Sequence, residues 1–179
     1  MSAYAELHCL SNFTFLRGAS HPAELVERAA ALGYTALALT DECSVAGVVR
    51  AHAAARRHAI KLLIGSEFTL ADGLRLVVLA ADREGYAALC GLITRGRRAA
   101  DKGAYHLVRA DFEPLPAGCL VLWLPPEVPE PGDASWLRAH FAGRAWLAVE
   151  LHANGDESQR CASLLAFADA SRIPPVAAG

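Results

Sequence analysis

The sequence has few cysteines, no long apolar run and little net charge, and each of these absences excludes a class of protein. Its five cysteines are odd in number, scattered and never in C-x-x-C spacing, which argues against a disulfide framework and a zinc knuckle. The longest apolar stretches, residues 76–81 and 119–126, are far too short to span a bilayer. Residues 1–8 carry neither a basic nor a long apolar segment, so we read no signal peptide and expect a cytoplasmic protein without membrane contact.

The charge balance does not support DNA binding by this chain alone. The formal net charge is −2, whereas a module that grips DNA phosphates by itself usually carries a net basic face. The one basic cluster spans residues 95–102, and a solvated helix end explains it better than a nucleic-acid contact. Apolar residues make up 54% and charged residues 20% of the 179 positions, which predicts one globular domain over residues 1–179.

Short apolar runs alternate with stretches of helical periodicity along the chain. Ser20 and Asp82 are the expected helix caps, and Pro22 falls in a first helical turn. We predict helices over residues 22–32, 45–59, 82–98, 134–142 and 157–171. We predict strands over residues 4–9, 34–40, 60–65, 74–81, 119–124, 145–151 and 174–178, with a turn over 68–73 and irregular chain over 99–118.

Alternating strands and helices favour an α/β fold of parallel strands joined by helical crossovers. The sequence contains no G-x-G-x-x-G after the first strand and no G-x-x-x-x-G-K-[ST], so dinucleotide-binding and P-loop folds have no fingerprint. A whole or distorted βα barrel fits this pattern better. In such a barrel the working residues lie at the carboxyl ends of strands.

Four predicted strand ends carry side chains of the kind that ligate metals. Imidazole and carboxylate ligands from several elements suit a divalent ion. Helix caps and buried histidines with backbone partners explain the same residues equally well, and spacing alone does not separate the two hypotheses. The residues are His8, Asp41, Glu42, Glu67, His152 and Asn154.

Several segments resemble the PHP (polymerase-and-histidinol-phosphatase) domain that opens bacterial C-family DNA polymerase alpha subunits. Two of them, E-L-H-C-L-S-N-F at residues 6–13 and T-D-E-C-S at residues 40–44, are closest to the error-prone branch. Residues 60–68, 82–95 and 149–160 extend the similarity over essentially the whole chain. The resemblance implies a distorted seven-stranded βα (TIM-like) barrel, here incomplete at its C-terminus because the chain stops before the last D-x-H motif and the polymerase module.

Metal-binding members of this family hold up to three ions in a cluster of histidine, aspartate, glutamate and cysteine residues. His8 matches the first histidine of the family's H-x-H motif, and Glu67 matches the glutamate after the third strand. The other ligand positions carry different residues here, namely Leu10, Arg17, Glu42, Arg75 and Asn154. Leucine cannot ligate a metal, and arginine is a permanent cation that repels one.

The resemblance therefore implies a vestigial site: His8 and Glu67 as remnants of metal ligands, Asp41 and Glu42 as remnants of catalytic residues, and residual zinc or manganese as the only cofactor to consider. The same substitutions introduced Arg17 and Arg75. We predict that arginine–carboxylate pairs replaced the metal cluster, with arginines pointing into solvent as the alternative.

Three functions remain open on the sequence. The first is an inactive structural domain of an error-prone DNA polymerase in replication and translesion repair, contacting the rest of that chain, DNA through the parent, and accessory proteins. The second is a metal-dependent phosphoesterase or 3′–5′ exonuclease, and the third is a histidinol-phosphatase-like enzyme. The loss of histidine ligands favours the first function.

Overall fold

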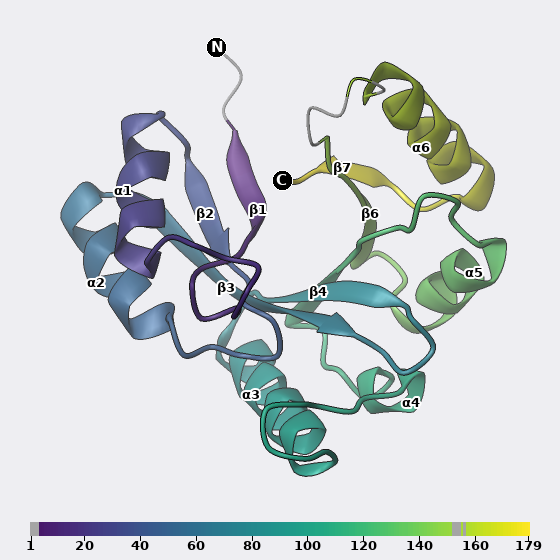
Figure 1. Ribbon diagram of the computed structural model, residues 1–179. Helices are drawn as coiled ribbons and strands as arrows, with labels where there is room; N and C mark the ends of the chain where they lie inside the picture. Colours follow the sequence, from purple (N-terminus) through teal and green to yellow (C-terminus); the bar gives the residue numbers. More distant parts are fainter. Residues whose placement is uncertain (1–3, 152–154, 156) are drawn as a thin grey trace.

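The computed structural model describes residues 4–151, 155 and 157–179, and within them seven strands form one sheet in the order β1 to β7. The sheet curls into a nearly closed barrel (Figure 1). This is the predicted α/β barrel. The strands are β1 (Ala5–Cys9), β2 (Ala36–Leu39), β3 (Lys61–Thr69), β4 (Arg75–Ala80), β5 (Cys119–Trp123), β6 (Ala145–Val149) and β7 (Pro175–Ala177).

Six helices occur in the same described part of the chain and lie outside the curled sheet (Figure 1). Helices α1 and α2 pair beside β1 and β2, α3 and α4 lie below β3 and β4, and α5 and α6 flank β6 and β7. Their bounds are α1 (Pro22–Ala31), α2 (Val48–His58), α3 (Arg83–Arg98), α4 (Arg109–Phe112), α5 (Pro131–His140) and α6 (Glu157–Ser171). No helix within the described ranges is long and apolar enough to cross a membrane.

The expectation that all strands are parallel was wrong for β4, which runs antiparallel to both β3 and β5. Strand β3 continues to Thr69, two residues into the predicted turn, and only residues 70–74 separate it from β4. A parallel crossover needs about a dozen residues or more, so this connection can only form a hairpin. Gly73 supplies the left-handed conformation of its turn, with φ at +90°. The remaining neighbours, β1–β2–β3 and β5–β6–β7, are parallel as predicted.

Helices α3 and α6 agree with their predicted bounds to within one residue, whereas α2 begins three residues later than predicted, α5 begins three residues earlier, and α4 falls in the stretch predicted as irregular. Asp82 caps α3 by accepting a hydrogen bond from the Gly85 amide at 2.7 Å, as predicted. Helix α1 begins at Pro22 as predicted, but its N-cap is His21, one residue after the expected Ser20. The Glu24 carboxylate accepts the His21 amide proton at 2.7 Å and so satisfies that end of the helix.

The edge strands β1 and β7 are not paired with each other in the described sheet, and a side chain of β1 bridges the gap. The Glu6 carboxylate on β1 accepts hydrogen bonds from the Gly179 amide and from the His8 amide, both at 2.9 Å. The barrel interior beneath the polar mouth is filled by small and medium apolar side chains from alternating strand positions. They are Ala38, Val77, Leu79, Leu122, Leu124, Ala148 and Ala178, all buried.

The five cysteines are free, as predicted, but only part of them lie in the core. Cys43 and Cys119 are buried, whereas Cys9, Cys90 and Cys161 are partly exposed. Two of the five cysteines therefore pack in the hydrophobic core.

Candidate functional site

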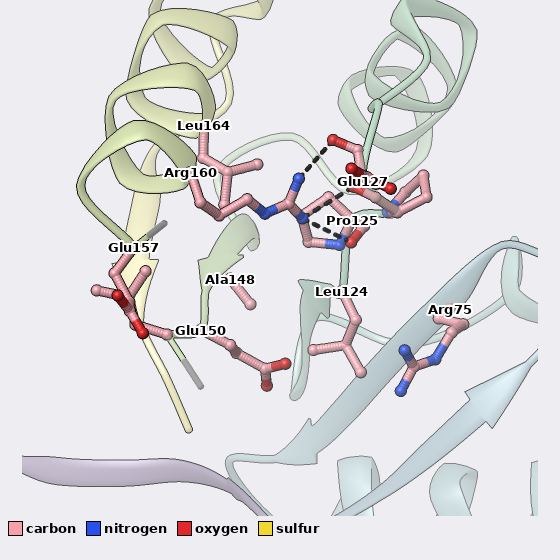
Figure 2. A pocket seen from close by; sticks show the side chains of 11 residues that line it. Arg75, Leu124, Pro125, Glu127, Ala148, Glu150, Glu157, Arg160 and Leu164 are labelled. Atoms are coloured by element: carbon pink, nitrogen blue, oxygen red, sulfur yellow. Dashed lines mark hydrogen bonds between the residues drawn. The ribbon is translucent and has the colours of Figure 1, made fainter. Parts of the chain in front are cut away.

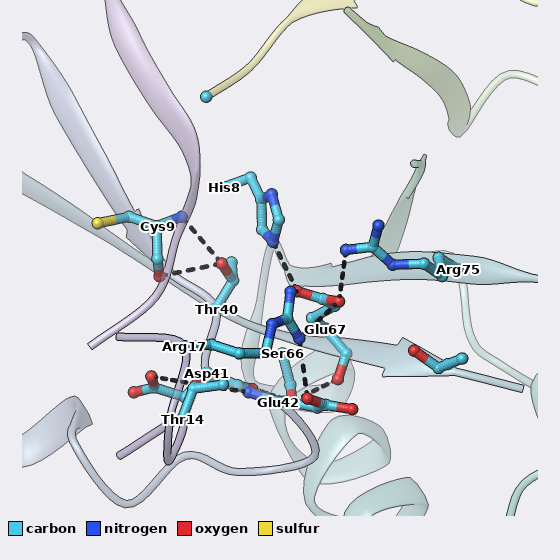
Figure 3. A network of polar contacts seen from close by, with 12 residues as sticks. His8, Cys9, Thr14, Arg17, Thr40, Asp41, Glu42, Ser66, Glu67 and Arg75 are labelled. Atoms are coloured by element: carbon cyan, nitrogen blue, oxygen red, sulfur yellow. Dashed lines mark hydrogen bonds and ion pairs between the residues drawn. The ribbon is translucent and has the colours of Figure 1, made fainter. Parts of the chain in front are cut away.

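Polar side chains gather at one mouth of the barrel, where β1, β2 and β3 end and the antiparallel β4 begins (Figure 3). His8 lies at the end of β1, Glu42 follows β2, and Glu67 lies near the end of β3. Arg75 reaches the same mouth because β4 runs in the opposite direction. His152 and Asn154, two residues predicted for this site, lie outside the described residues.

Glu67 is the centre of the site, and its side chain has no solvent exposure. Arg17 donates to both carboxylate oxygens of Glu67, with Nη1 to Oε1 at 3.0 Å and Nη2 to Oε2 at 2.9 Å. Arg75 Nη2 donates to Oε1 at 2.9 Å, and His8 Nε2 lies 2.9 Å from Oε2. Three cationic side chains therefore occupy both oxygens of one buried carboxylate (Figure 3).

The predicted pairing of arginines with the carboxylates is confirmed by these contacts. Arg17 also reaches Glu42, with Nη1 at 2.8 Å from Oε2. Arg17 and Arg75 keep 37% and 41% of their side chains exposed, so each joins the buried carboxylate to solvent. The bidentate fork of a guanidinium suits this role because it stays charged at any working pH.

His8 bridges two carboxylates and carries a positive charge near neutral pH. Its Nδ1 lies 2.5 Å from Glu150 Oε1, on the opposite side of the ring from Glu67. Burial by itself lowers the pKa of His8, but hydrogen bonds with Glu150 and Glu67 outweigh that effect and raise this pKa to about 9. His8 thus connects β1 to the residue that follows β6 across the barrel mouth.

The charge of Glu67 is stabilised by its three partners. Burial raises the pKa of this carboxyl, while the hydrogen bonds from His8, Arg17 and Arg75 lower it and prevail, leaving a pKa of about 2. Burial likewise lowers the pKa of Arg17, but hydrogen bonds to Glu67 and Glu42 raise it above its ordinary value. Both members of the pair are therefore ionised at neutral pH.

Asp41 does not join this cluster, although its position after β2 suggested that it would. It is 1% exposed and turns toward the loop between β1 and α1. There it accepts the Ser11 amide, the Ser11 hydroxyl and the Thr14 hydroxyl, each at 2.7 Å. Its role is that of an anchor for the loop over residues 10–21.

Glu42 stands at the rim of the site, with 27% of its side chain exposed. Its Oε1 accepts the Tyr105 hydroxyl at 2.8 Å, and that hydroxyl accepts the Thr69 amide at 2.8 Å. Tyr105 comes from the stretch predicted as irregular, where no signal pointed to it. Glu150 was missed as well, although a carboxylate directly after a strand was a signal that could have identified it.

The basic cluster over residues 95–102 was predicted to be a solvated helix end, and this prediction is incomplete because Arg97 makes specific contacts. Arg97 donates to the backbone oxygens of Glu42, Cys43, Gly103 and Ala104, at 3.2–3.3 Å. Its guanidinium carbon lies 5.5 Å from the centre of the Tyr105 ring. Arg97 therefore fastens the end of α3 to the segment that follows β2, beside the site.

A cavity of about 480 Å³ lies next to the cluster and shares Arg75 and Glu150 with it (Figure 2). Arg160 also lines this cavity, but both of its terminal nitrogens already donate hydrogen bonds within the protein. Its guanidinium donates to the backbone oxygens of Pro125, Pro126 and Glu127, as the dashed lines in Figure 2 show. The walls carry carboxylates as well as arginines, so the cavity has no single charge preference.

The residues present do not fit a metal ion. Both nitrogens of His8 are bonded to carboxylates, and both oxygens of Glu67 are bonded to cations. A metal bound to Glu67 would have to displace Arg17, whose charge would repel it. Among the residues that the structure describes, no group of three or more histidine, cysteine, aspartate or glutamate side chains is arranged to hold a metal.

A βα barrel with a cluster of charged side chains at the ends of its strands defines the class, and comparison with known proteins defines the family. The family model of the PHP domain matches residues 6–163. The chain belongs to the PHP domain family, which confirms the resemblance seen in the sequence.

The curated relatives include error-prone DNA polymerases. That of Pseudomonas aeruginosa is 59% identical over 181 residues, which cover 100% of this chain and 17% of the relative. That of Dechloromonas aromatica is 56% identical over 181 residues, covering 98% of this chain and 18% of the relative. The chain thus spans less than a fifth of the length of the curated relatives that it matches.

Solved structures with low sequence identity share the fold. An amidohydrolase from Chromobacterium violaceum, with bound sulfate and no metal, superposes with a TM-score of 0.72 at 18% identity over 99% of this chain and 87% of that chain. A candidate metal-dependent phosphoesterase from Bifidobacterium adolescentis gives a TM-score of 0.65 at 16% identity with the same coverages. They confirm the barrel and carry no argument about activity.

Proposed function

We propose that residues 1–179 form one PHP domain of an error-prone DNA polymerase and act there as a structural domain. The identity of 56–59% to error-prone DNA polymerases over nearly the whole chain supports such a polymerase as the parent protein. In this proposal the parent is a cytoplasmic nucleotidyltransferase of DNA replication and translesion repair after DNA damage. The domain contacts the rest of the polymerase, and reaches DNA and accessory proteins only through the parent.

One observation carries the structural role: His8, Arg17 and Arg75 together close over the buried carboxylate of Glu67. Catalysis on a phosphoester at this mouth would need a cation that binds substrate oxygens and activates water. Here the carboxylate that would hold such a cation is saturated by side chains of the protein. The network instead ties β3 to the loop after β1 and to β4, which stabilises the barrel.

A metal-dependent phosphoesterase or 3′–5′ exonuclease is the alternative, with a histidinol-phosphatase-like enzyme as a variant of it. The name of the Bifidobacterium structure favours a phosphoesterase for that protein. In this chain, the alternative would require Arg17 to leave Glu67 and Glu42 before any ion could bind.

The purified protein is expected to hydrolyse neither p-nitrophenyl phosphate nor single-stranded DNA when Mn²⁺ or Zn²⁺ is added. The reason is that a metal could replace any one of His8, Arg17 and Arg75 at Glu67, but at least one guanidinium would remain beside the metal and repel it. Turnover is measured after a second purification step, together with elemental analysis of the protein. Activity that persists there and disappears in the Glu67→Ala variant would establish the alternative.

In the full-length polymerase, Arg17→Met is expected to lower the melting temperature of the chain by a few degrees and to leave nucleotide insertion per folded molecule unchanged. The substitution leaves Glu67 buried with a reduced set of partners, while the insertion chemistry lies outside residues 1–179. Thermal unfolding and single-nucleotide insertion kinetics measure the two effects, with Arg57→Met on the exposed face of α2 as the control. A loss of insertion rate without a loss of stability would contradict the structural role.

A further inference from the structure

Two large apolar side chains project from the loop between β1 and α1. Phe15 is 83% exposed and Leu16 is 88% exposed, and we refer to these two residues as the apolar tip. Phe13 in the same loop is 39% exposed and lies against Arg50, whose guanidinium carbon is 5.7 Å from the ring centre. Exposed apolar side chains that adjoin one another mark interaction surfaces more often than isolated ones do.

The loop holds the apolar tip in one conformation. Asp41 binds the chain before the tip through Ser11 and Thr14, and Arg17 binds Glu67 and Glu42 directly after it. The Gly18 amide closes the turn on the Thr14 oxygen at 3.0 Å. A Cβ at Gly18 would lie 2.0 Å from the Ser11 oxygen, so only glycine fits there. A rigid loop of this kind loses little conformational entropy when it binds.

The backbone of the tip itself is strained. Leu16 has a φ of +65°, a left-handed conformation that a branched side chain adopts only at a cost. Glycine or asparagine would remove that cost. In this conformation the Leu16 side chain is exposed, like that of its neighbour in sequence, Phe15.

A hollow of about 430 Å³ adjoins the tip and leads back to the charged cluster. Phe13, Phe15, Glu42, Arg97 and Tyr105 are among the residues that line it. The Tyr105 hydroxyl and the Arg97 guanidinium are both engaged by Glu42, through its carboxylate and its backbone oxygen respectively. Tyr105 and Arg97 in this hollow are thus connected through Glu42 to the network that closes over Glu67.

We propose that the apolar tip and this hollow dock onto the remainder of the same polymerase chain, an inference that rests on the proposed function. The aligned segment covers only 18% and 17% of the two relatives, so most of their length lies outside it. A second copy of this chain is a less suitable partner for the tip and the hollow, because too little area would be buried. Three apolar side chains bury roughly 150–250 Å² each at most, below the roughly 800 Å² per partner of a stable dimer. A tethered segment needs less area, because its effective concentration reaches about the millimolar range.

The experiment places the photo-crosslinking residue p-benzoylphenylalanine at position 15 of the full-length polymerase. The control carries it at Val49 on α2, which is 78% exposed. We expect an intramolecular crosslink from position 15 to a segment beyond residue 179, at least about ten-fold more abundant than from position 49, since burial of one large apolar side chain corresponds to a ten-fold effect or more. An intermolecular product, or a yield no higher than the control, would overturn the proposal.

A second measurement does not depend on the crosslinker. The Phe15→Ser/Leu16→Gly double variant removes the apolar tip and relieves the backbone strain at position 16. Amide hydrogen exchange of the crosslinked segment should accelerate at least about ten-fold in this variant, and unchanged exchange would overturn the docking. The crosslink is read on a chain that keeps Arg17 and the whole charged network, whereas the Arg17→Met experiment reads melting temperature and insertion rate. Loss of the crosslink therefore contradicts the docking alone, and an unchanged melting temperature in Arg17→Met contradicts the structural role alone.

Discussion

Glu67→Gln should lower the free energy of unfolding by about 3–5 kcal/mol, the usual cost of removing one partner from a buried ion pair. The glutamine amide keeps the shape of the side chain but leaves His8, Arg17 and Arg75 facing a neutral group. Chemical denaturation near pH 7 measures the loss. Glu27→Gln on the exposed face of α1 is the matched control, and it should change stability by less than about 0.5 kcal/mol.

A double-mutant cycle with Arg17 shows whether this energy belongs to the pair. Arg17→Met alone should cost about 2–3 kcal/mol, below the full buried-pair value because more than a third of its side chain is in water. Combining it with Glu67→Gln should recover about 1 kcal/mol or more of the summed losses, since the two groups touch. Strictly additive losses, each below about 1 kcal/mol, would mean that the arginine is in effect solvent-facing and that the network does not stabilise the barrel.

Asp41→Asn should lower the free energy of unfolding by about 3 kcal/mol or more, since each buried polar group left without a partner costs about 1–3 kcal/mol. Asparagine keeps one acceptor oxygen, but its amide nitrogen donates and would meet hydroxyl or amide protons from Ser11 and Thr14. The loop that carries Phe15 should loosen with this loss, because Thr14 also accepts the Glu42 amide.

Two readouts separate this local effect from general instability. Amide exchange over residues 11–18 should accelerate more than exchange in β5, which lies away from the loop. Asp169→Asn, at an exposed position on α6, is the control and should leave both unchanged. Equal acceleration everywhere, or a stability loss no larger than that of the control, would show that Asp41 is not the anchor of the loop.

The charges of the described side chains at the mouth balance one another. With His8 protonated, three cations (His8, Arg17, Arg75) face three carboxylates (Glu42, Glu67, Glu150) at the mouth. A divalent ion would supply the same neutralisation from outside the chain. Arg17 and Arg75 supply theirs at any working pH, and they also join β4 and the loop after β1 to β3.

The sequence by itself determined the class of fold, the family and part of the set of residues that meet at the mouth, namely His8, Arg17, Glu42, Glu67 and Arg75. Strand and helix periodicity located the elements, since each element must turn an apolar face to the core. The replacement of metal-type residues by Arg17 and Arg75 was enough to predict the ion pairs with the carboxylates, because a permanent cation near a buried anion has one favourable partner. Local signals such as Asp82 also sufficed for a helix end, where the interaction spans three residues.

The tertiary structure alone decided the direction of β4, the orientation of Asp41 and the membership of Glu150 and Tyr105 in the site. Each depends on contacts between segments that are distant along the chain, and local patterns carry no information about them. Asp41 and Glu42 are adjacent in sequence, yet one turns toward the loop and the other toward the cluster, because successive side chains of an extended segment point to opposite sides. The curl of the sheet, a property of the whole barrel, decided that Asp41 faces the loop and that Glu42 faces the charged cluster.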